Sequence, residues 1–308
     1  IRLRFRTDDV VPRFASYSFL TIAHQKWMLT QSGNKATMAS LNHDIIKRIS
    51  LRLPAPVVQR DIVAILSAYD DLIENNRRRM ALLEQAAREL YREWFVRLRF
   101  PGHEHTRTIH GLPEGWKRKP LSELCESIDY GYTASAEQEE IGPKFLRITD
   151  IVPNFIDWST VPHCPIEDDR LERFRLREGD IVIARTGATV GYAKRLHKRH
   201  PDAVFASYLV RLRLKPEVDN LMVGVFVESE DYKNYVKSRV GGAAQPNANA
   251  RVLAAAEIFV PPPRIQRDFH DFVEVMVDER ETLQLQNQNL RTARDLLLPR
   301  LMSGEIAV

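Results

Sequence analysis

Cysteine is scarce in this sequence, and long apolar segments are missing. The 308 residues contain two cysteines, Cys125 and Cys164, which are too few for a disulfide framework or a cysteine-ligated zinc site. No apolar run approaches the length of a membrane span, and the first residues lack the apolar core of a signal peptide. We therefore expect a cytoplasmic protein with no metal centre of its own.

Signatures of catalysis are also scarce. The chain has neither the Asp/Asn-Pro-Pro-Tyr/Phe tetrapeptide of amino-methyltransferases nor a Walker phosphate-binding motif. Asp202 and the tripeptide 231–233 form a nuclease-like set, but the tripeptide lies in a segment of helical character. His103, His105 and His110 lack further ligands at metal-binding spacing and are interpreted as part of a polar loop. We expect no enzymatic activity, and the open alternative is a stand-alone nuclease or methyltransferase.

Charge and length set broad limits. The 45 Lys and Arg residues exceed the 41 Asp and Glu residues, so the net charge is +4 and the pI is about 9.0. This excess mildly favours an anionic partner. With 44% hydrophobic and 28% charged residues, the composition is that of a globular protein, and the length allows about two domains.

The strongest organisational signal is a repeat. Residues 54–95 recur at 261–302, a shift of 207 residues without a gap, and ten of the 42 aligned positions are identical. The identical pairs include Pro54/Pro261, Pro56/Pro263, Gln59/Gln266, Arg60/Arg267 and Asp61/Asp268. Each copy predicts one long helix that begins at its prolines, because proline is tolerated in the first helical turn.

Each predicted helix carries an apolar position every seven residues, as in a coiled-coil seam. The seam residues are Ile62, Tyr69, Leu83 and Leu90 in the first copy, and Phe269, Met276, Leu283, Leu290 and Leu297 in the second. The flanking residues Ile65, Leu72, Ala86, Phe272 and Ala293 are expected to widen the stripe. Asn76 lies in the seam, where a polar residue costs stability but specifies register. We predict that the two helices pair; the alternative is an ordinary bundle core.

The repeat also extends upstream of the helices and predicts the domain organisation. We predict an α+β protein with a remnant of a first globular domain (1–53), a long helix (54–97), a linker (98–115), a complete second domain (116–260), and a second long helix with its tail (261–308). Within the remnant, residues 1–6 and 45–53 have strand patterns and residues 14–30 a helical one. In the second domain, the runs 145–148, 181–184 and 204–214 predict strands of a mostly antiparallel sheet, and 221–240 predicts helix.

Three stretches of the second domain are candidates for DNA contact. The turn within GDIVIARTGATVG carries Arg185, Thr186 and Thr189, with glycines that permit close approach of another surface. The stretch 185–215 has eight basic residues, among them Lys194, Arg195, Lys198 and Arg199, with only Asp202 opposing them, which suits phosphate contacts or guanine recognition. Gln245, Asn247 and Asn249 carry amides that can read adenine. The alternatives are a tight turn, a solvated charged face and helix capping.

The ordered set of GWKRKPLSEL, GDIVIARTGATVG, FASYLVRLRLKP, AQPNANA, PPPRIQRDF and LLPRLMSGEI resembles the specificity subunit of type I restriction–modification systems over nearly the whole chain. The resemblance implies a non-catalytic subunit whose two target-recognition domains each read half of a bipartite site in double-stranded DNA. It further implies two antiparallel helices that separate these domains and scaffold methyltransferase and restriction (motor–nuclease) subunits. Catalysis, S-adenosylmethionine, ATP and Mg would then belong to those partners.

The chain departs from that family pattern in its first domain, which is reduced to about 50 residues. Two alternatives stay open: the sequence is a fragment, or the natural protein is truncated and recovers two domains by forming a homodimer. A third functional alternative is a pure interaction protein, in which the helix pair is the whole function and no nucleic acid is bound.

Overall fold

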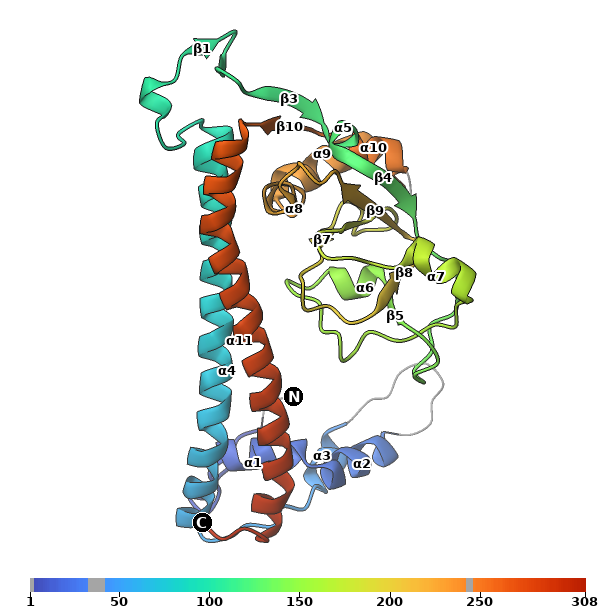
Figure 1. Cartoon of the computed structure of the whole chain (residues 1–308). Helices are drawn as coiled ribbons and strands as arrows, with labels where there is room; N and C mark the ends of the chain where they lie inside the picture. Colours follow the sequence, from blue (N-terminus) through green and yellow to red (C-terminus); the bar gives the residue numbers. More distant parts are fainter. Residues whose placement is uncertain (1–2, 33–41, 242–245) are drawn as a thin grey trace. The chain divides into compact units, whose positions relative to one another are not determined.

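The computed structural model describes residues 3–32, 42–241 and 246–308, and they form two compact units. The first unit comprises residues 1–83 and 278–308, and the second comprises residues 84–277. The boundary crosses both long helices, α4 (Pro56–Tyr91) and α11 (Pro263–Ser303), which appear in Figure 1 in cyan and red. No helix within the described ranges is long and apolar enough to cross a membrane. The domain boundaries predicted from the sequence stay a prediction.

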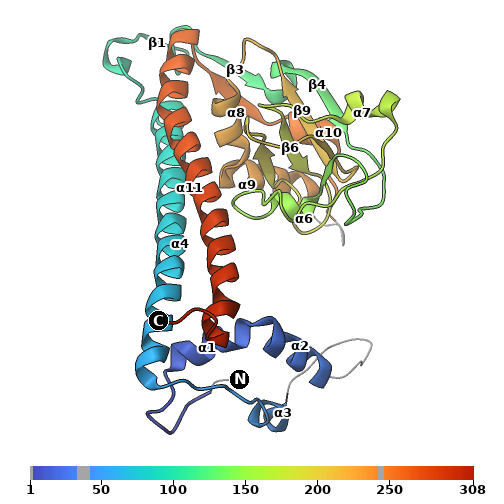
Figure 2. The same cartoon turned by 60° about the horizontal axis from the view of Figure 1, so that its bottom comes forward.

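The first unit is helical. Besides its parts of α4 and α11, it contains α1 (Pro12–Leu20), α2 (Ile22–Gln31) and α3 (His43–Lys47). Phe14 and Tyr17 of α1 pack on Ile62 and Leu66 of α4 and on the end of α11. Figure 2 shows α1 beside the start of α4 and the end of α11. The single helix predicted over 14–30 is two helices, because Thr21 adopts an extended conformation with ψ of 145°.

Polar contacts within the first unit show that α4 and α11 are antiparallel. Asp70 accepts a hydrogen bond from Arg294 at 2.6 Å, and Asn76 donates to Asn287 at 3.1 Å, so residue numbers rise along one helix as they fall along the other. Asn76 and Asn287 are both buried. The expectation that Asn76 lies in the seam is confirmed. Its partner Asn287 was not predicted, because it does not lie at the predicted seven-residue positions of the second helix. A buried amide pair of this kind satisfies itself in only one register.

The seam of the long helices is wider than predicted, and it widens on the side opposite to the predicted flanks. A heptad seam has two core positions, and the predicted seam contains only one of them. On α4 the missed position holds Leu66, Ile73, Met80, Ala87 and Trp94, which are all buried. Of the predicted residues, Ile62, Phe269 and Leu283 are buried, whereas Tyr69, Leu83, Leu90, Met276, Leu290 and Leu297 are half-buried. The proposed flanks were wrong for Ile65, Leu72, Ala86 and Phe272, which are exposed, while Ala293 is half-buried.

The second unit has an α+β fold. Its helices are α5 (Leu121–Leu124), α6 (Ile148–Ile151), α7 (Asp168–Phe174), α8 (Asn220–Val227), α9 (Glu230–Val240) and α10 (Ala250–Ala254), with a π-helical turn at Arg92–Val96 and a 3-10 turn at His103–His105. Its strands are β1 (Thr108–Ile109), β2 (Leu112–Pro113), β3 (Lys117–Pro120), β4 (Cys125–Tyr130), β5 (Lys144–Leu146), β6 (Ile181–Ala184), β7 (Ala193–Arg195), β8 (Ala203–Phe205), β9 (Leu209–Leu214) and β10 (Glu257–Val260).

A four-stranded antiparallel sheet in the order β4-β9-β6-β7 is the frame of this unit. Strand β10 pairs with β3 antiparallel, and β5 pairs with β8 parallel. Side chains of β6 alternate between two buried clusters: Ile181 and Ile183 enter one, and Val182 and Ala184 enter the other. Both faces of the sheet are therefore covered, which explains why β6 is apolar throughout.

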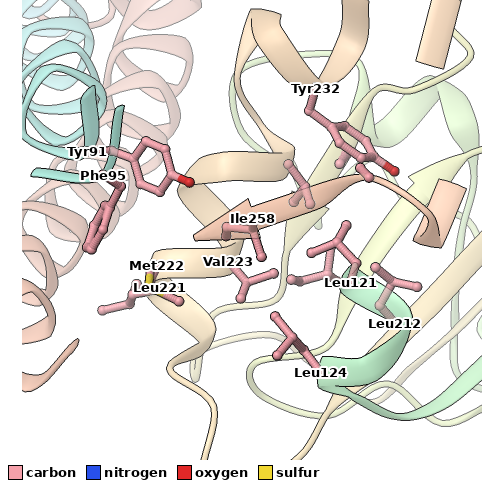
Figure 3. Packing of buried hydrophobic residues seen from close by; sticks show 14 of the residues in the cluster. Tyr91, Phe95, Leu121, Leu124, Leu212, Leu221, Met222, Val223, Tyr232 and Ile258 are labelled. Carbon is pink, nitrogen blue, oxygen red and sulfur yellow. The ribbon is translucent and has the colours of Figure 1, made fainter. Parts of the chain in front are cut away.

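The larger cluster joins the sheet to the long helices of the same unit. Figure 3 shows Leu121, Leu212 and Ile258 packed around Val223, with Tyr91 and Phe95 nearby. The rings of Phe95 and Phe269 lie 4.7 Å apart, at 72° to each other. The π-helical turn at the end of α4 allows the adjacent residues Trp94 and Phe95 to be buried together.

The repeat seen in the sequence includes four successive helices. Helices α1, α2, α3 and α4 begin 207 or 208 residues before α8, α9, α10 and α11. The shared glutamine has the same structural role in both copies. Gln59 donates to the carbonyl of Pro54 at 2.7 Å, and Gln266 donates to that of Pro261 at 2.9 Å, each tying the entry of its long helix.

Two strands predicted in the first unit are not formed. Residues 3–6 correspond to β9, which is hydrogen-bonded to β4 on one side and β6 on the other. Residues 50–53 correspond to β10, which pairs with β3, while 45–47 belong to α3 as their counterparts belong to α10. The described part of the first unit holds no counterpart of β3, β4 or β6. A strand pattern without a hydrogen-bonding neighbour leaves its backbone extended but unpaired.

Candidate nucleic-acid interface

One end of the four-stranded sheet gathers the predicted turn and several exposed side chains. Arg185 directly follows β6, Tyr130 is the last residue of β4, and Ser207 and Tyr208 precede β9. The register pairs Ala184 with Leu209 and Tyr130 with Val210, so these residues meet where β4 and β6 end and β9 begins, at one end of the sheet. Tyr208 is 61% exposed and Tyr130 44% exposed.

At this end of the sheet, Arg185 is held by three uncharged groups: a ring, a carbonyl and an amide. Its guanidinium lies 4.7 Å from the ring centre of Tyr130 and donates to the carbonyl of Ser207 at 3.5 Å and to Oδ1 of Asn247 at 3.4 Å. Its Nε is buried without a hydrogen-bond partner among the described residues. We call Arg185, Tyr130, Ser207 and Asn247 the Arg185 cluster.

A short backbone pairing brings Asn247 beside Arg185, although they are 62 residues apart. Thr186 and Asn247 form an isolated antiparallel bridge. The amide of Gly187 donates to the carbonyl of Pro246 at 3.0 Å, and that of Ala248 donates to the carbonyl of Arg185 at 2.8 Å. Gly187 has a φ of +77° with open space where a side chain would be, so glycine serves the turn conformation here.

The residues predicted to contact DNA from the turn and from the amide stretch differ in exposure and in hydrogen bonding. Thr186 and Thr189 are half-buried in the turn, and Asn247 is exposed. Asn249 caps α10 by accepting from the amide of Val252 at 2.9 Å, so the capping alternative is confirmed for this residue. Gln245 lies outside the described residues.

Lys194 and Arg195 are structural rather than surface cations. Lys194 is 9% exposed, and its ammonium donates to the carbonyl of Asn154 at 2.8 Å and to Glu228 at 3.3 Å. Arg195 donates to Asn220 at 3.0 Å. Both lie on β7, which adjoins β6 far from the Arg185 cluster, because Arg195 pairs with Ile181 at the other end of that strand. Lys198 and Arg199 are exposed.

Asp202 is the one acidic residue within the basic stretch, but carboxylates from outside the stretch also oppose its basic residues. Arg211 is buried against Asp129 at 2.7 Å, and Arg213 forms a two-pronged pair with Asp180 at 2.9 and 2.7 Å. Burial works against ionisation of Asp129, but hydrogen bonds from Arg211 and Ser127 and the charge of Arg211 lower the pKa of this carboxyl below its ordinary value. Asp202 itself pairs with Arg175.

Other candidate chemistry is not assembled in the described structure. Residues 231–233 lie on α9, as predicted, and Tyr232 between them is fully buried. His103 is bonded through its ring to the carbonyl of Phe100 at 2.9 Å. Across the described ranges, no group of three or more His, Cys, Asp or Glu side chains could hold a metal ion. Tyr130 was not among the predicted site residues, because nothing near it in the sequence links it to Arg185.

Comparisons with known proteins connect both repeats to one family. The family "Type I restriction modification DNA specificity domain" matches residues 2–85 and 113–290. The type I restriction enzyme MjaIX specificity subunit of Methanocaldococcus jannaschii is 24% identical, over 98% of this chain and 70% of that protein. The HindI specificity subunit of Haemophilus influenzae is 22% identical, over 91% of this chain and 73% of that protein.

A solved structure supports the same assignment at the level of the fold. The S subunit of a type I restriction–modification system from M. genitalium aligns with a TM-score of 0.58 and 16% identity, over 95% of this chain and 73% of that one. The family match covers well over half of the sequence, including most of both long helices and the sheet that carries the Arg185 cluster. The chain therefore belongs to the type I restriction–modification DNA specificity family.

Proposed function

We propose that this chain is the sequence-reading, non-catalytic subunit of a type I restriction–modification complex. The observation that carries the proposal is the family match over both repeats of the chain. The relatives are named as specificity subunits of type I restriction enzymes, which suits a chain that recognises DNA and assembles with other subunits.

Arg185 and Asn247 are the proposed base-contacting residues. Arginine donates to O6 and N7 of guanine, and an asparagine amide can contact adenine or donate to N7 of either purine in the major groove. Thr186 and Thr189 of the turn are proposed to contact phosphates beside the Arg185 cluster. The exposed Lys198 and Arg199 follow β7 at the other end of β6 and are proposed to contact phosphates farther along the duplex, although Lys198 also lies 4.0 Å from Glu274. Lys194 and Arg195 are left out of this surface because their side chains are bonded within the fold.

The long helices are the proposed docking sites for the methyltransferase subunits. Their N-terminal halves carry exposed apolar residues at equivalent repeat positions: Ile65 of α4 corresponds to Phe272 of α11, and Ala68 to Val275. Leu72 continues the first of these surfaces and is 51% exposed. Two equivalent apolar surfaces suit two copies of one partner. Methyl transfer with S-adenosylmethionine, and restriction with ATP and Mg, are proposed to belong to partner subunits.

Selection from a random library tests the proposed function. The purified chain, alone and with the methyltransferase subunit of its system, is incubated with randomised duplexes, and bound duplexes are sequenced. Enrichment of one short fixed sequence is expected. Absence of any enriched sequence in both samples contradicts the proposal. Cutting or methylation of DNA by the chain alone, with Mg and S-adenosylmethionine added, would favour the enzyme alternative.

Charged substitutions on the exposed apolar positions test the docking surfaces. Leu72→Asp on α4 and Val275→Asp on α11 are each expected to weaken methyltransferase binding about tenfold or more, because a carboxylate in an apolar contact must be desolvated without a partner. Binding is measured by sedimentation or surface capture with the purified methyltransferase subunit.

The matched control for the docking test is Gln286→Asp, an exposed polar position on α11. It introduces the same charge and is expected to leave binding unchanged. Thermal unfolding of all three variants should stay close to that of the unmodified chain, because each side chain is exposed. Equal binding by the Leu72 and Val275 variants and the control would show that the partner docks elsewhere.

A further inference from the structure

Arg185 differs from other arginines of the basic stretch in what holds it. Arg211 and Arg213 are paired with the carboxylates of Asp129 and Asp180. Arg185 is held only by a ring, a carbonyl and an amide, and no carboxylate contacts it among the described residues. A guanidinium held by neutral groups keeps its full charge, and each of the two terminal nitrogens of Arg185 has a second N–H for an external acceptor.

The ring beneath Arg185 is itself fixed in place. The hydroxyl of Tyr130 accepts a hydrogen bond from the amide of Ala250 at 3.0 Å, which ties the ring to the start of α10. The next residue is Gly131, where an added Cβ would lie 2.2 Å from the carbonyl oxygen of Ala206. The backbone after Tyr130 is thus packed against the segment that leads into β9, and this packing leaves the ring little freedom.

The side-chain amide of Asn247 is oriented by its hydrogen bond with Arg185. Its Oδ1 accepts from Arg185, and no hydrogen bond of its Nδ2 group is found within the described ranges. Together, Arg185 and Asn247 offer hydrogen-bond donors. Of the base-pair edges in the major groove, guanine is the one that offers two neighbouring acceptors, O6 and N7, to such a pair.

We infer that Tyr130 is a positioning residue that fixes Arg185 for contact with a guanine, while Asn247 donates to an acceptor on the same or the adjacent base pair. The inference rests on the proposed function, because it presupposes that this chain reads DNA. It adds a specificity-determining residue, Tyr130, that need not touch DNA, and it names the base that the cluster recognises.

The inference is tested on the duplex that library selection identifies. Each guanine of that duplex is replaced in turn by 7-deazaguanine, which lacks the N7 acceptor but pairs normally. With the unmodified chain, one position is expected to lose affinity about tenfold, because loss of N7 breaks one of the two hydrogen bonds of a bidentate arginine contact and leaves only O6. In the Arg185→Ala variant, the same replacement should have no effect, since the contact is already absent.

Tyr130→Ala is expected to reduce the preference for guanine at that position about fivefold, as for loss of a cation–π contact, and to leave the salt dependence unchanged. Tyr130→Phe keeps the ring and should keep most of the preference. Thermal unfolding of both variants identifies loss of fold, in which all sequences would be bound more weakly to the same extent.

The outcomes separate this inference from the proposed function. If the unmodified chain selects no sequence, the proposed function fails. If it selects a sequence but the Tyr130→Ala variant, with unchanged thermal unfolding, retains the full guanine preference or loses affinity equally for all duplexes, the positioning role of Tyr130 is overturned. Insensitivity of every guanine to the 7-deaza replacement overturns the assignment of guanine.

Discussion

Replacing Arg185 with alanine is expected to remove most of the preference of this protein for its own DNA site over unrelated duplexes. The reason is geometric, because uncharged groups at the end of the sheet hold the guanidinium of Arg185 in place without neutralising its charge. A bidentate arginine contact contributes about 1–3 kcal/mol of discrimination, so the ratio of specific to non-specific affinity should fall about 10- to 100-fold. Competition binding with matched and scrambled duplexes at fixed salt measures this ratio.

Two matched variants sharpen the Arg185 experiment. Arg185→Lys keeps the charge but not the planar donor fork, so non-specific affinity should persist while the preference is lost. Arg199→Ala removes an exposed cation. We expect it to weaken binding to all sequences alike and to reduce the slope of log affinity against log salt by about one. A normal site preference in Arg185→Ala would refute the assignment of this residue.

Replacing Arg213 with methionine is expected to destabilise the fold by about 3–5 kcal/mol without altering the base preference of the folded fraction. Asp180 is 2% exposed and receives two hydrogen bonds from Arg213, so the substitution leaves a buried carboxylate whose one remaining hydrogen bond within the described ranges comes from the amide of Arg177. Chemical denaturation followed by circular dichroism gives the free energy of unfolding, and duplex competition gives the preference.

A second substitution separates lost packing from the uncompensated charge. Adding Asp180→Asn to Arg213→Met removes the unpaired carboxylate while keeping an acceptor for the amide of Arg177, so part of the lost stability should return. If Arg213→Met unfolds no more readily than the unmodified chain but loses site preference, Arg213 would be a DNA contact rather than a structural cation.

These two arginines illustrate which parts of the site could be predicted from the sequence. The turn with Arg185 was predictable, because glycines and an arginine directly after an apolar strand are a local pattern. The pairing of Arg213 with Asp180 was not, because these residues are 33 residues apart and belong to different elements. The density of basic residues in the sequence therefore predicted a larger cationic surface than the structure has, because carboxylates that are distant in the sequence pair with Arg211, Arg213 and Lys194.

The long helices show the same division. Their existence and starting points were predictable, because a 207-residue repeat and proline positions are properties of the sequence alone. The second core position of the seam, with Leu66 and Ile73, was missed, and Ile65 and Leu72 were placed on the wrong side. Apolar residues occur on both sides of α4, and only the partner helix decides which of them are buried.

By itself, the sequence determined the repeat, the long helices, the strand at 181–184, the alternation of elements typical of an α+β domain and the order of motifs that identifies the family. All of these depend on periodicity or order along one chain. Tertiary structure decided which cations are neutralised, which face of each helix is buried, and that Tyr130 and Asn247 lie beside Arg185. The physical reason is that pairing, burial and the availability of a strand partner depend on residues that are distant in the chain.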